Sequence, residues 1–296
     1  MEKEENKASA VKAAHFQPLF TACLLYVAGL ILTFLYIQPG KTYIEENQIA
    51  MPQVDPVPII LYFLGVVVVI GLILYFIPIS KLKLILRLLF AFFYAWGIFV
   101  ITGIFLPVYV SIGLGAALAI IWLFLPFIWL QNVLLLITLV GVGGVFGAMI
   151  SPWSMVAVMA VISVYDVVAV FSGYMMWMAK RLSMTDSLPA FIFPAKAGDF
   201  RINVRGSESR TIFESEKAER DYSLLGGGDI GFPLIFVTAV YFHYDLAAAL
   251  LVAAFSLGGL VLAYILQMTL MKGKPLPALP PISLMTIIGF LIVYFI

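Results

Sequence analysis

The sequence AVISVYDVVAVF at residues 160–171 carries one charged residue, Asp166, and LLGGGDIGFPLIF at residues 224–236 also carries one, Asp229. An α-helix rises about 1.5 Å per residue, so about 20 apolar residues cross a hydrocarbon core roughly 30 Å thick. Both aspartates lie in apolar runs of that kind. A charged side chain deep in a bilayer costs at least about 2.5–3.5 kcal/mol, and intramembrane acids are therefore functional candidates.

Composition places the whole chain in lipid. Of its 296 residues, 63% are hydrophobic and 11% are charged, whereas a soluble domain has about 25% charged residues. A water-soluble fold cannot cover so much apolar side chain, which makes the bilayer the expected partner of most of the surface. The net charge of +1 argues against a nucleic-acid partner. The single cysteine, Cys23, is expected to be an apolar packing residue.

Hydropathy and proline positions predict an all-α polytopic membrane protein. One long polar segment, residues 180–223, separates an N-terminal six-helix part, residues 1–179, from a C-terminal three-helix part, residues 224–296. Prolines next to the apolar runs are plausible joints, because proline breaks a helix interior. Pro39-Gly40, for example, is expected to end the first span. The nine predicted spans are 18–37, 57–78, 84–106, 108–127, 130–150, 153–178, 224–242, 245–270 and 281–296.

The basic residues test this topology. With the N-terminus in the cytosol and nine spans, all of the 17 lysines and arginines except Lys41 fall in cytosolic segments. The positive-inside rule expects this asymmetry. We therefore predict a cytosolic N-terminus and an extracytosolic C-terminus.

The two buried acids lack a basic partner within the spans, since Arg87 sits at a helix end and can reach the interface. Two adjacent acids without a cation should share one proton, which is the state that an aspartic protease needs. From the residues alone the alternatives are a transporter or channel that relays protons or cations through the acids, and a structural pair that holds helices together.

Three consecutive glycines directly precede the second acid, Asp229. Gly226, Gly227 and Gly228 are poor helix formers, so the helix is expected to begin or loosen at Asp229, where bare backbone would let a substrate chain approach. Small-residue helix packing is the other explanation of such glycines, and it accounts better for GVGGVFG at 141–147.

Depth constrains how the acids can meet. Asp229 lies eight residues after Asp221, roughly 12 Å along a helix, whereas Asp166 lies fourteen before Lys180, roughly 21 Å. The two can meet only if the sixth helix breaks well before Lys180. Gly173 is the natural break, and it would leave residues 174–182 as a short interfacial helix.

Four other segments have weaker signals. KGKPLPALPPIS at 272–283 is rich in prolines and is expected to be extended. In the polar segment, 188–196 is apolar enough to lie against the membrane or the protein, while RINVRG (201–206) and RTIF (210–213) have the β-branched residues of strands. A strand edge near the acids could pair with an extended substrate. Asn132 is expected to bond between helices.

These pieces together resemble a known family. Tyr165-Asp166, Gly226-x-Gly228-Asp229 and Pro277-Ala278-Leu279-Pro280 are similar to the YD, GxGD and PAL motifs of presenilins and signal peptide peptidases. Their order, the nine spans and the large loop between the sixth and seventh spans match over essentially the whole chain. PALP and the cytosolic N-terminus look closer to presenilin, and the short chain resembles compact microbial homologues. Gly227 departs from the commoner leucine, which bears on substrate preference.

The resemblance implies an intramembrane aspartic endopeptidase that cleaves transmembrane helices of other proteins. It implies Asp166 and Asp229 as the catalytic pair, with Tyr165, the three glycines and the PALP residues supporting the site. No metal and no cofactor are expected. Neither is an obligatory partner subunit, while a homo-oligomer stays open. The membrane would be the cell membrane in a microbe and an ER- or Golgi-type membrane in a eukaryote.

Overall fold

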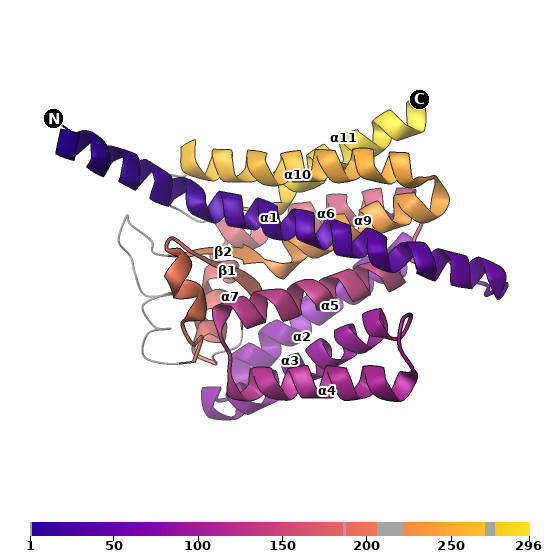
Figure 1. Ribbon diagram of the computed structural model, residues 1–296, viewed down its shortest axis with the longest axis horizontal. Helices are drawn as coiled ribbons and strands as arrows, with labels where there is room; N and C mark the ends of the chain where they lie inside the picture. Colours follow the sequence, from indigo (N-terminus) through magenta and orange to yellow (C-terminus); the bar gives the residue numbers. More distant parts are fainter. Residues whose placement is uncertain (1, 186–187, 206–221, 270–275) are drawn as a thin grey trace.

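The computed structural model describes residues 2–185, 188–205, 222–269 and 276–296, and it is an elongated bundle of helices (Figure 1). Six described helices are long and apolar enough to cross a membrane, counting α1 from Gln17 onward. They are α1 (Glu2–Glu46), α2 (Pro56–Phe76), α3 (Ile79–Thr102), α5 (Ile128–Met149), α6 (Pro152–Phe171) and α10 (Leu246–Thr269). Three shorter apolar helices accompany them: α4 (Val108–Phe124), α9 (Gly227–His243) and α11 (Leu279–Phe295).

The remaining elements lie between α6 and α9. They are a short helix α7 (Tyr174–Ser183), strand β1 (Ala190–Pro194), a 3-10 helix η1 (Ala197–Arg201) and strand β2 (Tyr222–Gly226). The two strands pair antiparallel, with Ile192 opposite Leu224. This hairpin and α7 gather at one end of the bundle, and the two chain termini lie at opposite ends (Figure 1).

Proline marks most helix boundaries, as the sequence predicts, but not the end of the first helix. Pro56, Pro107 and Pro152 lie at or directly before helix starts, where a missing N–H costs nothing. The predicted stop at Pro39-Gly40 is wrong, because α1 continues to Glu46. Packing overrides the proline here: Tyr36 and Ile37 are buried, and Tyr36 lies so close to Gly144 of α5 that no side chain would fit there.

Helices α5 and α9 form the centre of the bundle. They pack against each other along their length, with α1 and α3 beside α5 and α10 beside α9. Glycines make the close approach possible: a methyl group on Gly147 would lie 2.4 Å from the Thr238 side chain, and one on Gly143 would touch Leu234. The glycine cluster at 141–147 is thus confirmed as a helix-packing surface.

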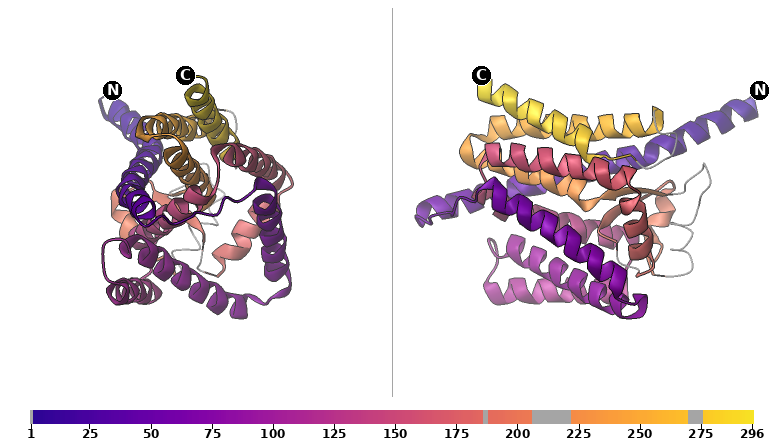
Figure 2. Two further views of the ribbon diagram at one scale, coloured as in Figure 1. Left: turned by 90° about the vertical axis from the view of Figure 1, so that its right-hand side faces the viewer. Right: turned by 180° about the vertical axis from the view of Figure 1, so that it is seen from behind.

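Helix α2 lies at the periphery, and only 6% of its span is buried. Viewed down the bundle it stands at one side, away from α10 and α11 (Figure 2). Contacts to α6 and α7 attach it to the rest of the molecule. Arg181 of α7, for instance, donates to the Leu74 carbonyl near the end of α2 at 2.9 Å.

Lys41 stabilises the C-terminal end of α9. Its amine donates to the Tyr241 carbonyl at 3.3 Å and lies 5.0 Å from the centroid of the Tyr241 ring. A cation at a helix C-terminus and over an aromatic face contributes about 1 kcal/mol. We expect Lys41→Met to lower the melting temperature in detergent by about 2–4 °C, measured by intrinsic fluorescence. The same substitution at exposed Lys81 should leave it unchanged, and equal shifts in both variants would contradict this role.

Candidate active site

Asp166 is held on the inner face of α6, where it is 8% exposed. The helix ends at Phe171, five residues later, and Gly173 takes a left-handed conformation with φ of +76° before α7 begins at Tyr174. Residues that carry a side chain rarely adopt this backbone conformation, whereas glycine does so freely. The predicted break at Gly173 and the short helix after it are therefore confirmed.

Asp229 stands in the first turn of α9, directly after β2. Its Oδ2 accepts the backbone N–H of Gly226 at 3.1 Å. That N–H belongs to the residue before the helix, so the carboxylate satisfies a donor that has no partner within the helix. The helix dipole also favours a negative charge at this end. The predicted span at 224–242 begins too early, because residues 222–226 are strand and the helix starts at Gly227.

The PALP segment reaches Asp166 from the start of α11. Residues 276–278 are not helical, but α11 begins at Leu279. The extended conformation expected for 272–283 is therefore wrong from Leu279 onward, and residues 272–275 lie outside the described residues. Prolines 280 and 281 have no N–H. Of the first three residues of α11, Leu279 is therefore the one with an N–H. This N–H donates to Oδ2 of Asp166 at 3.2 Å in a buried position.

The two aspartates lie near each other where α6, α9 and α11 pack together. Helix α6 packs against both α9 and α11, and the two carboxyl groups are close enough for their charges to interact. Each uses its Oδ2 to accept a backbone N–H from the start of a helix. The structure thus brings all three motifs to one place.

Three aromatic rings pack together beside the aspartate pair. Phe63 of α2 lies between Tyr165 and Phe232, with both ring centroids 5.8 Å from its own and edge-to-face geometry. Tyr165 directly precedes Asp166, and Phe232 lies about one helical turn after Asp229, so α2 contacts the site through Phe63. No feature of the sequence separates this phenylalanine from the other 23.

The three glycines before Asp229 differ in what surrounds them. A methyl group on Gly226 would lie 3.1 Å from Oδ2 of Asp229, and one on Gly227 would lie 3.2 Å from the Pro189 carbonyl oxygen. Gly228 is exposed, and a methyl group there would lie 3.3 Å from the Phe232 ring. The first two leave room for the hairpin and the carboxylate, and the third leaves open backbone beside Asp229.

Gly226→Ala should therefore impair the site without unfolding it. Its backbone angles, φ −60° and ψ 142°, suit alanine, so the effect comes from crowding of the Asp229 carboxylate. We expect at least a tenfold loss of proteolytic rate, about 1.4 kcal/mol, with an unchanged melting temperature. Gly113→Ala in α4, where a methyl group meets nothing within 4 Å, is the control and should keep full activity. Full activity in both would refute the crowding argument.

The polar segment differs from its predicted form. The described part of RINVRG, residues 201–205, does not form a strand: Arg201 ends η1, and Asn203 makes only an isolated bridge to Phe127. RTIF lies outside the described residues. The strands are instead AFIFP at 190–194 and YSLLG at 222–226. The apolar segment 188–196 therefore lies against the protein, with all five residues of β1 buried.

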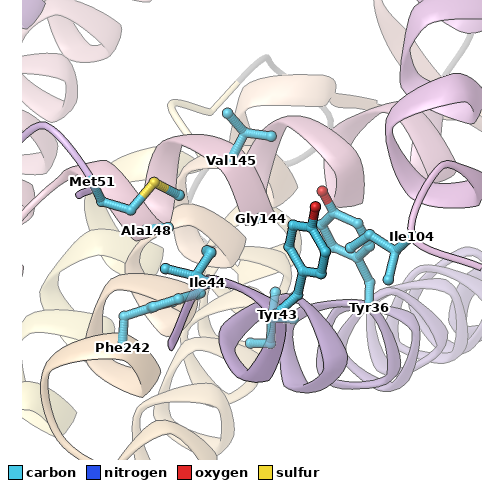
Figure 3. Close-up of a pocket in the computed structure, with 11 residues that line it drawn as sticks. Tyr36, Tyr43, Ile44, Met51, Ile104, Gly144, Val145, Ala148 and Phe242 are labelled. Carbon is cyan, nitrogen blue, oxygen red and sulfur yellow. The ribbon is translucent and has the colours of Figure 1, made fainter. Parts of the chain in front are cut away.

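Hollows elsewhere in the molecule are remote from the aspartates. Two share Ile44, Met51, Ala148 and Phe242 among their lining residues. Figure 3 shows one of them, with Tyr36 and Tyr43 of α1 facing Ile104. Phe242 lies thirteen residues beyond Asp229, about 20 Å along α9, so these hollows belong to the opposite end of the helix. Within the described ranges, no three His, Cys, Asp or Glu residues are grouped to hold a metal.

Comparison with known proteins agrees with the three motifs. The family model described as signal-peptide peptidase, presenilin aspartyl protease matches residues 23–296. Two solved structures of a presenilin family intramembrane aspartate protease, in space groups C222 and P2, share the fold. Their TM-scores are 0.62 and 0.57 at 17% and 16% identity, covering 93% and 94% of this chain and 98% of each of those chains. No curated protein sequence matches this chain. The chain therefore belongs to the signal-peptide peptidase and presenilin aspartyl protease family and is a multi-pass membrane aspartic protease.

Proposed function

We propose that Asp166 and Asp229 are the catalytic pair and hydrolyse peptide bonds within transmembrane helices of other proteins. The observation that carries this proposal is their placement: two acids with interacting charges, each anchored through Oδ2 by one helix N-terminal N–H. Both of these hydrogen bonds come from neutral backbone N–H groups, so neither brings a compensating positive charge to the carboxylates. One shared proton is then the favourable state of the pair.

In this mechanism the ionised aspartate takes a proton from a water held between the pair. The water oxygen bonds the scissile carbonyl carbon while the protonated aspartate donates to the carbonyl oxygen, which gives a tetrahedral diol. The aspartate that is now ionised takes a proton from one diol hydroxyl, the other donates its proton to the amide nitrogen, and the C–N bond breaks to give a carboxylic acid and an amine. The pair titrates as a unit, so acid and base belong to the pair rather than to one residue. The backbone bonds at Gly226 and Leu279 hold the carboxylates in place through both steps.

A helical substrate must unwind before its backbone reaches the pair, and β2 offers a place for the extended chain. Along an antiparallel strand, the backbone N–H and carbonyl of successive residues point alternately toward the partner strand and away from it. Ile192 points its N–H and carbonyl away from β2, toward Asn132. Its partner Leu224 therefore points its own backbone groups outward, and Leu224 is 41% exposed. A substrate strand added here would run directly beside Asp229.

We further propose nine membrane crossings, with the N-terminus in the cytosol and the C-terminus outside it. Termini at opposite ends of the bundle (Figure 1) support an odd number, as does the positive-inside distribution. The hairpin and the aspartates then lie toward the cytosolic side. The enzyme acts without an obligatory partner subunit, in the cell membrane of a microbe or an ER- or Golgi-type membrane of a eukaryote.

Reconstituted vesicles separate this function from the transporter alternative. Purified protein in proteoliposomes should cleave a single-span substrate, while a pH-sensitive dye inside the vesicles should report no proton flux above that of empty vesicles. Proton flux that depends on both aspartates, together with an intact substrate, would favour the relay and refute the protease proposal.

A further inference from the structure

The buried amide of Asn132 bonds the backbone of β1 rather than another helix. Its Nδ2 donates to the Ile192 carbonyl at 2.8 Å, and its Oδ1 accepts the Ile192 N–H at 3.0 Å. These two bonds reproduce the pair that a neighbouring strand would make with Ile192. The expectation that Asn132 joins helices is therefore wrong, and its side chain acts as a substitute strand along the inner edge of β1.

The adjacent residue extends this edge. Gln131 donates from Nε2 to the carbonyls of Leu188 and Ala190, at 3.2 and 3.5 Å. Asn132 and Gln131 are 3% and 1% exposed, so water does not compete for these bonds. One edge of the hairpin is thereby closed, and the outer edge of β2 at Leu224 is the one that stays open among the described residues.

Asn132 also helps to set where the open edge of β2 lies along the bundle axis relative to Asp229. Helix α5 carries Asn132 near its start and packs against α9 through Gly143 and Gly147 further along. Strand β1 is held to α5, β2 is held to β1, and β2 continues directly into α9. A single rigid helix thus sets where the strand edge stands against the start of α9.

We propose that Asn132 is a positioning residue: it holds the hairpin in one register against α5 and thereby determines which peptide bond of a substrate strand at the outer edge of β2 faces the aspartates. This rests on the proposed function. Without Asn132, the Ile192 N–H and carbonyl lose their partners, and β1 can shift along α5 and carry β2 with it. A slip of the strand register presents a different bond to the same two carboxylates.

The test uses Asn132→Leu, which keeps the side-chain size and removes both bonds. We expect about a tenfold loss of kcat/KM on a single-span substrate, mostly through KM. Mass spectrometry of the products should show cleavage at additional neighbouring bonds, and the Ile192 amide should exchange faster with deuterium. Thr138→Val removes a buried hydroxyl that bonds Leu134 within α5, and as the matched control it should keep the wild-type products.

A second variant covers the case in which Asn132→Leu does not fold. An amide-to-ester replacement at Ile192 removes only the N–H that Asn132 accepts and should shift the products in the same direction. Wild-type products from either folded variant would overturn the positioning role. A wild-type protein that cleaves nothing would refute the proposed function, and this inference with it, whereas shifted exchange with unshifted products would refute the inference alone.

Discussion

Asp166→Asn and Asp229→Asn should each lower the proteolytic rate by at least about 10³-fold, and the double variant should be no slower than either. Asparagine keeps the shape of the side chain but cannot take or give the proton, and general acid–base catalysis contributes about 10²–10⁴-fold. Residues that act as one unit are non-additive when removed. Product formation from a single-span substrate, followed by mass spectrometry, measures all three variants.

The matched control is Asp245→Asn. Asp245 is exposed and accepts the Ala248 N–H at the start of α10 at 2.8 Å, a task that asparagine performs equally well. Its activity should equal that of wild type. Residual activity above about one tenth in either single variant, or a further large loss in the double variant, would contradict a pair that shares one proton.

Removing the Leu279 N–H should produce the second largest effect. Replacing leucine 279 by its α-hydroxy acid converts the amide to an ester, which keeps the side chain and deletes the donor to Asp166. A hydrogen bond to a charged group contributes about 1.5–3 kcal/mol, so kcat should fall about 10–100-fold. Single-turnover cleavage measures this loss directly.

The same ester at Leu246 controls for the chemistry. Leu246 is the first residue of α10, as Leu279 is of α11, but it lies at the exposed surface. Its ester should cleave at the wild-type rate. If the Leu279 ester also kept the wild-type rate, the PALP segment would have no electrostatic role toward Asp166, and its contribution would be limited to shape.

The break in the sixth helix could be predicted from sequence because it follows from length alone. Two acids at different depths cannot meet on two straight helices, and Gly173 was the residue able to adopt a positive φ. The family followed from three motifs whose order is specific. Both predictions rest on short motifs or on the rise per residue of a helix, and both can be obtained from the sequence without knowledge of long-range contacts.

The hairpin could not be predicted in the same way. Strand β1 pairs with residues 222–226 across a long polar segment, and Asn132 from a third element bonds its backbone at Ile192. No pattern within either strand encodes that partner, so β-branched residues at 201–206 were the stronger but misleading signal. Pro39 misled for the same reason, since α1 packs on α5 through Tyr36 before the proline and bonds α9 through Lys41 after it.

The backbone donors at the aspartates were equally hidden. Sequence patterns point to functional side chains and not to backbone groups. The Leu279 N–H is free to bond Asp166 because α11 begins at this residue and because the two residues after it are prolines. Phe63 likewise matters through its place between Tyr165 and Phe232. Such contacts come from the packing of α2, α6 and α11, and helix periodicity alone does not determine them.

The most direct test of the whole account is to cleave a single-span substrate with the purified protein in ¹⁸O-labelled water. We expect a new C-terminus inside the apolar span that carries one oxygen from water, and we expect this product to disappear in Asp166→Asn and Asp229→Asn. Cleavage only in the polar flanks of the substrate, or the same labelled product from both variants, would contradict it.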